Sequence, residues 1–499
     1  MVLQLASQNI RERKGAFFTP KIWVELSQKY IANVFGDNWQ NEYYVWDCAA
    51  GTGNLLAGLT NKHNIWASTL DQVDVEIIKK RIKNDICLLK SHVFQFDFLN
   101  DDFAKLPVGL QNIINDETKR KKLIIYINPP YAETMSKGGE HKAGLNKSMV
   151  NDKYLSKMRN CANRELFVQF LTRIYHEIPD CKIANFSTLK ILQSPCFSDF
   201  RKMFHAALEK LFVVPANTFE NVKGRFPIGF YIWNTEKQEK YEQITANIYS
   251  ENNQQAIFAG QKTIHCYDGN RLINEWIMST RNRKNERKIG FISCLGNDFQ
   301  QNNVVFIIND KNQMASPRGS WITDKNLIEV SIYFSVRKVI PADWLNDRDQ
   351  FLYPNDDWQT DKEFQNDCLA YTLFKNNIQS KHGVNHWIPF TESEVHSRNK
   401  FDSNFMTGFI DRNMSSAAQT VFNAGRELWQ YYFMQPNCNV NASLYEIREY
   451  FQGRNNKSRM KNKSGDETYN ELIGNLRSAL KILANKIEPK VYEYGFLKT

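Results

Sequence analysis

The stretch that most constrains the fold is an apolar run at residues 123–127 followed directly by Asn128, Pro129, Pro130 and Tyr131. The run is typical of a buried strand, and the prolines end it because they fix φ and offer no backbone donor. Open α/β sheets bind their ligands at the carboxyl ends of strands. At that end the Asn128 amide oxygen and the Pro129 carbonyl are acceptors and Tyr131 offers an aromatic face, which suits a flat base with an exocyclic amine.

Small residues and two glycines follow an earlier strand pattern. Residues 45–47 form a short run that ends in Asp47 and leads to Ala49, Gly51 and Gly53. Glycine lets a ligand approach the backbone closely because it carries no side chain. The G-x-G spacing lacks the third glycine of the dinucleotide fingerprint, which argues against a nicotinamide or flavin cofactor.

Two further strand patterns end in an acid. The first, at residues 65–70, leads to Asp71, at about the right distance from the glycines to bind ribose hydroxyls. Asp74 competes for this role, and either acid could instead cap the following helix. The second leads to Asp97 and Phe98, where the carboxylate is placed to accept from an adenine amino group while the ring packs against the base.

The order of these motifs resembles that of one enzyme family. A Phe-Phe-Thr-Pro segment at residues 17–20 comes first, and residues 47–53, 97–98 and 128–131 follow it. In this order the chain is similar to the S-adenosylmethionine-dependent DNA methyltransferases that modify N6 of adenine. It looks like the gamma-like class, in which a target recognition region follows the catalytic domain and which occurs in type II restriction-modification systems or as orphan enzymes.

The resemblance implies a cofactor, S-adenosyl-L-methionine, and a set of residues that hold it. The segment at residues 17–20 would form a wall over the methionine part of the cofactor. The loop that contains Gly51 and Gly53 would line its amino acid end. Asp71 would hold the ribose, and Asp97 would hold the adenine. The implied cofactor-binding residues are Phe18, Thr19, Pro20, Asp47, Ala49, Gly51, Gly53, Asp71, Asp97 and Phe98. Phe17 is left out because it could equally point into the core.

The resemblance also implies methyl transfer to an adenine that has left the duplex, at a cost of roughly a few kcal/mol. The adenine amino group is a poor nucleophile, and two acceptors on its hydrogens would free its lone pair. The implied catalytic residues are Asn128, Pro129, Pro130 and Tyr131, and Tyr131 would also stack on the base. A second aromatic wall is expected from Phe219 rather than Phe226, although either could simply be a core residue.

The length indicates more than one domain, because 499 residues exceed what one hydrophobic core usually organises. Strand and helix patterns alternate in the first half and lose this regularity afterwards. We expect an α/β, Rossmann-like methyltransferase domain with a mostly parallel sheet at residues 1–240, and a mixed α+β target recognition domain at residues 241–499. The polar segment 132–163 is expected to be a lid that orders on DNA, or else a passive insertion.

The net charge of +10 suits a polyanionic partner, which we expect to be double-stranded DNA. A separately encoded restriction endonuclease is a further candidate partner. Two basic groups in the second half could neutralise phosphates, although a charge run is usually a solvated face. They consist of Arg281, Arg283, Lys284, Arg287 and Lys288, and of Arg454, Lys457, Arg459, Lys461 and Lys463.

Several sequence features restrict the class of protein. No stretch approaches the roughly twenty apolar residues that span a bilayer, so we expect a cytoplasmic protein. The nine cysteines are scattered without a C-x-x-C pair, and we expect them to be reduced. His382 and His386 are four apart without the adjacent acid of a metalloprotease, so no metal site is expected.

Other functions remain open at this point. The same tetrapeptide would suit an RNA methyltransferase or a protein-glutamine N-methyltransferase, and a relative could bind DNA without catalysis. The DNA sequence that would be recognised cannot be derived, because base reading depends on groove geometry.

Overall fold

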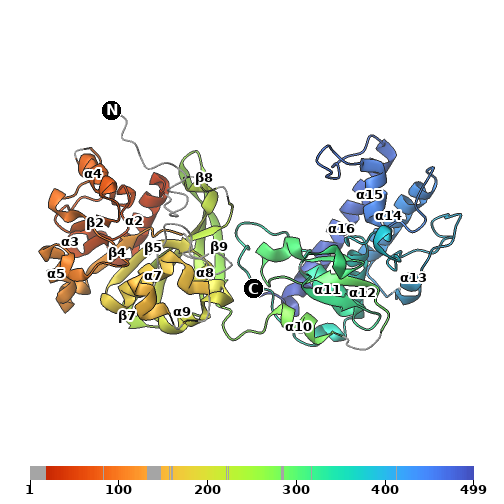
Figure 1. Ribbon diagram of the computed structural model, residues 1–499, viewed down its shortest axis with the longest axis horizontal. Helices are drawn as coiled ribbons and strands as arrows, with labels where there is room; N and C mark the ends of the chain where they lie inside the picture. Colours follow the sequence, from red (N-terminus) through yellow and green to blue (C-terminus); the bar gives the residue numbers. More distant parts are fainter. Residues whose placement is uncertain are drawn as a thin grey trace. The chain divides into compact units, whose positions relative to one another are not determined.

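The structure of the chain is a computed structural model (Figure 1). It describes residues 18–131 and 148–499, with the exception of positions 83, 157, 159, 160, 221, 223, 282–285, 316 and 412 and the side chain at 161. The chain divides into two compact units, Met1–Asp268 and Gly269–Thr499. The boundary falls later than the expected position 240, because two further strands continue the sheet of the first unit beyond that residue.

In the first unit the described residues form a nine-stranded sheet with the order β3-β2-β1-β4-β5-β7-β6-β8-β9. The strands β1 to β5 pair in parallel, while β7 runs antiparallel to both of its neighbours. Their bounds are β1 (Tyr44–Asp47), β2 (Ile65–Thr69), β3 (Val93–Gln95), β4 (Leu123–Ile127), β5 (Lys182–Thr188), β6 (Ala206–Pro215), β7 (Pro227–Gln238), β8 (Gln243–Asn252) and β9 (Gln255–His265). This is the mostly parallel, Rossmann-like α/β fold that the sequence predicts.

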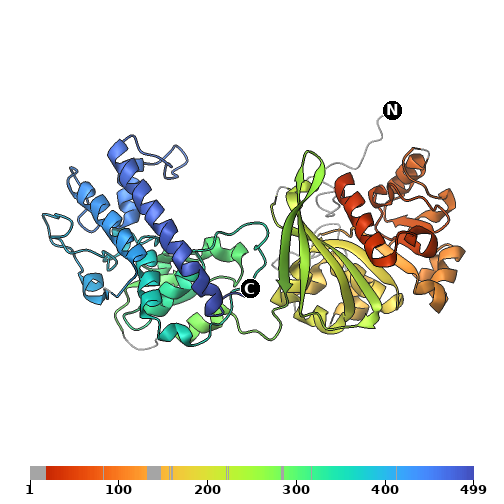
Figure 2. The ribbon, with the colours of Figure 1, turned by 180° about the vertical axis from the view of Figure 1, so that it is seen from behind.

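Helices cover the sheet of the first unit on both faces, and α2 lies against the strands β6 and β9 (Figure 2). The helices are α2 (Lys21–Phe35), α3 (Trp39–Glu42), α4 (Gln72–Arg81), α5 (Val108–Asn115), α6 (Glu117–Arg120), α7 (Leu166–Glu177), α8 (Lys190–Gln193) and α9 (Ser198–Met203). Chain order reverses on the two sides of β1, since β2 lies on one side and β4 on the other. Such a switch point opens a crevice at the carboxyl ends of the strands.

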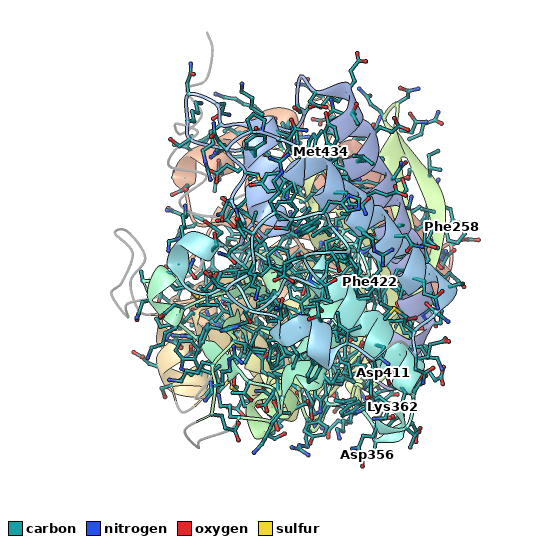
Figure 3. The ribbon with its side chains drawn as sticks, turned by 90° about the vertical axis from the view of Figure 1, so that its right-hand side faces the viewer. Phe258, Asp356, Lys362, Asp411, Phe422 and Met434 are labelled. Carbon is teal, nitrogen blue, oxygen red and sulfur yellow. The ribbon has the colours of Figure 1, made fainter. Side chains whose placement is uncertain are left out.

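The second unit is a mixed α+β domain, as expected. A small antiparallel sheet has the order β11-β10-β12. Its elements are β10 (Gly290–Ser293), β11 (Phe306–Ile308), β12 (Gly319–Ile322), α10 (Ile273–Ser279), α11 (Leu327–Val336), α12 (Lys362–Leu373), α13 (Phe405–Phe409), α14 (Ser416–Phe433), α15 (Leu444–Gln452) and α16 (Glu467–Glu493). Phe422 of α14 is part of the hydrophobic core of this unit, and Met434 just beyond that helix is exposed. Both residues are labelled in Figure 3.

Within the described part of the chain, no helix is both long and apolar enough to cross a membrane. The same residues contain no cluster of three or more histidine, cysteine or acidic side chains that could hold a metal. Among the cysteine side chains that the structure describes, seven are free thiols and Cys196 is disulfide-bonded. The expectation that all cysteines are reduced is therefore wrong for this structure.

Candidate functional site

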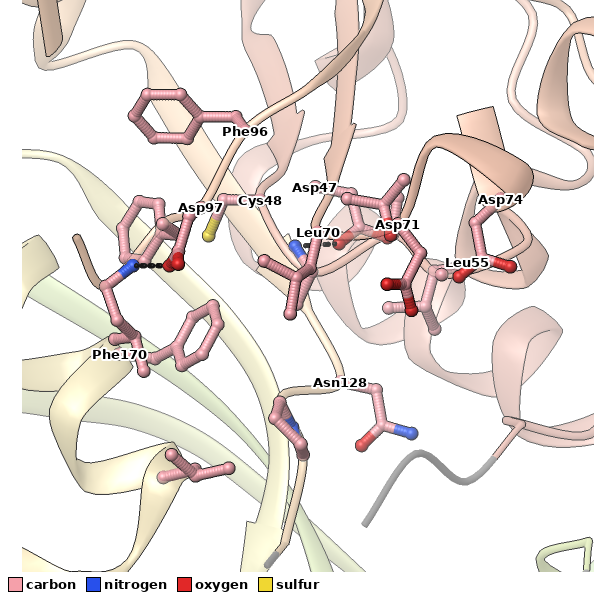
Figure 4. A pocket seen from close by; sticks show the side chains of 18 of the residues that line it. Asp47, Cys48, Leu55, Leu70, Asp71, Asp74, Phe96, Asp97, Asn128 and Phe170 are labelled. Atoms are coloured by element: carbon pink, nitrogen blue, oxygen red, sulfur yellow. Dashed lines mark hydrogen bonds between the residues drawn. The ribbon is translucent and has the colours of Figure 1, made fainter. Parts of the chain in front are cut away.

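A cavity of about 380 Å³ lies at the carboxyl ends of β1, β2, β3 and β4 (Figure 4). It is where the switch point in the strand order places a ligand site. Most of the residues that the sequence singles out line this one cavity. They are Phe18, Thr19, Asp47, Ala49, Gly51, Asp71, Asp97, Phe98, Asn128 and Pro130.

The glycine loop after β1 forms one side of the cavity. Gly51 and Gly53 have φ of +52° and +83°, a region that L side chains rarely adopt. Gly51 lines the cavity, whereas a Cβ on Gly53 would lie 2.9 Å from Cδ1 of Ile86, so Gly53 allows the loop to pack. Arg81 of α4 holds the loop from behind by donating to the Thr52 carbonyl over 2.8 Å.

Asp47 is almost completely buried at the end of β1 and faces the cavity. Its Oδ1 accepts a hydrogen bond of 3.1 Å from the backbone N–H of Ala49. Burial raises the pKa of this carboxyl to about 8, although the Ala49 hydrogen bond acts in the opposite direction. A cationic ligand in the cavity would favour the ionised form of Asp47.

The acids after β2 and β3 also reach the cavity. Asp71 is the N-cap residue of α4 and Asp74 lies in the first turn, and both line the cavity, so the structure keeps both candidates for the ribose (Figure 4). Asp97 accepts hydrogen bonds of 3.0 Å from the Leu99 N–H and 2.9 Å from Nδ2 of Asn100. These bonds fix the Asp97 carboxylate at the cavity wall.

The ring of Phe98 is held in place by residues of α7. It stacks on Phe170 with ring centroids 5.0 Å apart and an interplanar angle of 15°. Arg173 lies 5.3 Å from the Phe98 ring centroid, donates to the Asp101 carbonyl over 2.8 Å and pairs with Glu177 at 2.7 Å. Arg173 thus connects the loop after β3 to α7.

Hydrogen bonds link Asn128, which follows β4, to both Tyr131 and Thr19. Nδ2 of Asn128 donates to Oγ1 of Thr19 over 2.9 Å, and the hydroxyl of Tyr131 donates to Oδ1 of Asn128 over 2.6 Å. The bond to Thr19 fixes the orientation of the Asn128 amide, because the nitrogen faces Thr19 and the oxygen faces Tyr131. Burial also raises the pKa of the Tyr131 hydroxyl, which therefore stays protonated as a donor.

The structure does not bring every predicted residue to the cavity. Pro20 precedes α2, where its carbonyl accepts from two N–H groups of the first turn, and Pro129 is buried. Phe219 is buried in the core with its ring 5.8 Å from that of Phe186, and Phe226 lies partly buried at the edge of the same core. Their proposed role against a base stays a prediction. Phe17 and residues 132–147 of the expected lid lie outside the described part of the chain.

Several residues that line the cavity are not indicated by the sequence patterns. Leu70 and Asn100 adjoin predicted acids, so proximity in sequence was a usable signal for them. Ser148 and Phe170 come from distant segments, and only the apolar pattern of α7 pointed to Phe170. The missed residues are Cys48, Ala50, Asn54, Leu55, Thr69, Leu70, Phe96, Leu99, Asn100, Ser148, Leu166 and Phe170, in addition to the alternative Asp74.

The charge of the cavity is one-sided. Among the described residues that line it are four carboxyl groups, those of Asp47, Asp71, Asp74 and Asp97, and there is no lysine, arginine or histidine. Such a wall repels phosphates and attracts a cation. The site therefore suits a ligand with positive charge, hydroxyl groups and a flat ring.

No protein-family model matches the chain, and no curated protein matches it. The solved structures that resemble it include a DrdV–DNA complex, with 13% identity and a TM-score of 0.35 over 49% of this chain and 28% of that chain. A type I restriction-modification methyltransferase subunit from Streptococcus thermophilus is 16% identical, with a TM-score of 0.34 over 48% of this chain and 50% of that chain. A nuclease-deletion mutant of the type ISP restriction-modification enzyme LlaGI, bound to a DNA substrate mimic, is 11% identical with a TM-score of 0.38 over 58% and 35%. The chain thus spans half or less of the length of these three structures.

Proposed function

We propose that the chain is a DNA methyltransferase that transfers a methyl group from S-adenosyl-L-methionine to the N6 amino group of an adenine flipped out of double-stranded DNA. One observation carries the proposal: the described residues that line the cavity include four carboxyl groups, no cation, and an asparagine amide whose orientation is fixed. The cavity suits a positively charged donor molecule, and the amide suits an amino group that is to be methylated. We place the enzyme in a restriction-modification or related system.

The residues of the cavity fit the cofactor. When bound, the cofactor supplies an already activated methyl group. Asp47 and Gly51 would hold its amino acid end, Asp71 or Asp74 its ribose hydroxyls, and Asp97 with Phe98 its adenine. Phe18 and Thr19 line the same cavity from the segment before α2 and would close it over the methionine part.

The protein then has to position the amino group and polarise it. Oδ1 of Asn128 and the carbonyl of Pro129 would accept the two N–H hydrogens of the adenine, which shifts electron density back to the nitrogen lone pair. Oδ1 accepts from Tyr131 in the structure, so the adenine N–H would use the second lone pair of Oδ1 or displace the Tyr131 hydroxyl. The bond from Nδ2 to Thr19 keeps the nitrogen of the amide occupied, so that the oxygen is the atom presented to the base.

The test is to express the chain in a host that lacks adenine methylation and to sequence the host DNA for modified bases. We expect N6-methyladenine within one sequence motif, and its loss in Asn128→Ala. Calorimetry should show that Asn128→Ala still binds S-adenosylmethionine, since Asp47 and Gly51 are unchanged. Modified cytosine in place of adenine, or equal modification by the variant, would contradict the proposal.

A further inference from the structure

A group of basic side chains in the second unit belongs to neither of the predicted basic groups. Lys375 lies two residues after the end of α12, Arg448 is on α15 and Arg477 is on α16. We call these three residues the cation cluster. Desolvation and both guanidinium groups lower the pKa of the Lys375 ammonium, and the same guanidinium groups oppose the rise that burial causes in the pKa of the Tyr469 hydroxyl.

Packing of the helices explains why these cations meet. The rings of Phe451 on α15 and Tyr469 on α16 stack with their centroids 4.4 Å apart and an interplanar angle of 17°. Arg448 lies one turn before Phe451 on α15. The start of α15 is tied to the segment after α12, because Oγ of Ser380 donates to Oε1 of Glu446 over 2.7 Å.

No acidic residue in the described part of the chain pairs with the cation cluster. The positions three and four residues away on the helices, where a neutralising acid would stand, hold Leu444, Tyr445, Phe451 and Gln452 around Arg448, and Ile473, Gly474, Leu480 and Lys481 around Arg477. Among the described residues, none of the three cations forms an ion pair or a side-chain hydrogen bond. By contrast, Arg454 of the predicted basic group already pairs with Glu449 at 2.5 Å.

Two donors at this place also lack acceptors. Nε of Arg448 and the hydroxyl of Tyr469 are buried and have no hydrogen-bond partner in the described part of the chain. Desolvation and then the two guanidinium groups lower the pKa of Lys375, so the cluster is mutually repulsive. Buried donors and unpaired cations are what a bound anion relieves.

We infer that the cation cluster of Lys375, Arg448 and Arg477 is an anion site that binds phosphate groups of the DNA backbone, an inference that rests on the proposed function. The side chains of Lys375 and Arg477 reach the surface, although surrounding atoms still desolvate the Lys375 ammonium, and Lys481 extends the basic surface by one turn of α16. An open surface of this kind on several elements suits a polyanion better than a single small anion. Contacts to the backbone position a duplex and carry no sequence information.

The test uses the exposed pair, because Arg448 is partly buried. Lys375→Gln/Arg477→Gln is compared with Lys362→Gln, a control at the other end of α12 (Figure 3). Within the described ranges the Nζ of Lys362 donates to Gln365 alone. Binding of a DNA duplex is measured by fluorescence anisotropy over a range of salt concentrations. Each lost phosphate contact lowers the salt slope by about 0.9, so we expect the double variant to lose about 1.8 and the control to keep the wild-type slope.

Three outcomes would overturn the inference, or the function beneath it, in distinguishable ways. A wild-type slope in the double variant, with host DNA still methylated by the wild type, refutes the cation cluster and leaves the proposed function standing. Binding of inorganic phosphate that the variant loses, without any change in the DNA slope, assigns the site to a free anion and equally refutes it. A wild type that binds S-adenosylmethionine but methylates no DNA refutes the proposed function itself.

Folding of the double variant is checked by thermal unfolding. Both replaced side chains are exposed and mutually repulsive, so we expect an unfolding midpoint equal to or above that of the wild type. A lower midpoint would show that the two cations support the fold, and it would contradict their assignment to an anion site.

Discussion

The hydrogen bond between Thr19 and Asn128 offers the sharpest test of the proposed chemistry. Thr19 is 4% exposed, and its Oγ1 accepts from Nδ2 of Asn128 over 2.9 Å. Thr19→Val keeps the shape but removes the acceptor, so the amide can turn over and present its nitrogen to the substrate. A buried donor without a partner costs about 1–3 kcal/mol. At about 1.4 kcal/mol per tenfold in rate, we expect kcat to fall by between about fivefold and about a hundredfold.

The assay is transfer of a labelled methyl group to duplex DNA under saturating cofactor. Thr19→Ser is the matched control, because it keeps the hydroxyl and should retain a kcat close to that of the wild type. Because Thr19 also lines the cofactor cavity, the Kd for S-adenosylmethionine is measured for both variants, and kcat is compared only at cofactor concentrations that saturate each of them. Equal kcat for the valine and serine variants would refute the idea that Thr19 orients the amide.

The same cavity supports three further predictions. Tyr131→Phe removes the competing hydroxyl from Asn128 but keeps the ring, so KM for DNA should stay equal or fall in steady-state assays, whereas a variant as poor as Tyr131→Ala would contradict this. Because burial raises the pKa of Asp47 to about 8, this carboxyl is mostly protonated at neutral pH, and a cation favours its ionised form. Affinity for the cofactor should therefore rise by up to about tenfold per pH unit from about pH 6 to about pH 8, and calorimetry should detect the released proton. A flat pH profile, or the same slope in Asp47→Asn, would disprove this role of Asp47. Gly53→Ala brings a Cβ within 2.9 Å of Ile86 at a φ of +83°, so it should destabilise the fold by more than about 1 kcal/mol in denaturant unfolding, and an unchanged midpoint would count against the strain.

Sequence patterns predicted the part of the site that each strand carries at its own end. Short apolar runs precede Asp47, Asp71, Asp97 and Asn128. Because parallel strands place the positions at their carboxyl ends side by side, this pattern predicts that the four residues lie close together. The fold class of the first unit followed from the same alternation of strands and helices.

The remainder of the site depends on contacts between distant segments. Ser148 and Phe170 enter the cavity from outside the strand ends, and the apolar pattern around Phe170 predicts a helix without indicating a ligand site. An aromatic residue in this sequence position is compatible both with stacking on a base and with core packing, and Phe219 lies in the core. The extension of the sheet by β8 and β9 could not be foreseen either, because their alternation is typical of half-buried strands in either unit.

The one-sided charge of the cavity has a consequence for turnover. In the proposed reaction the sulfur of the donor becomes neutral once the methyl group has left, and the carboxyl groups of the cavity no longer attract that atom. Fresh donor should therefore displace its own by-product more readily than shape alone would allow. An acidic wall of this kind would reduce product inhibition by the demethylated donor.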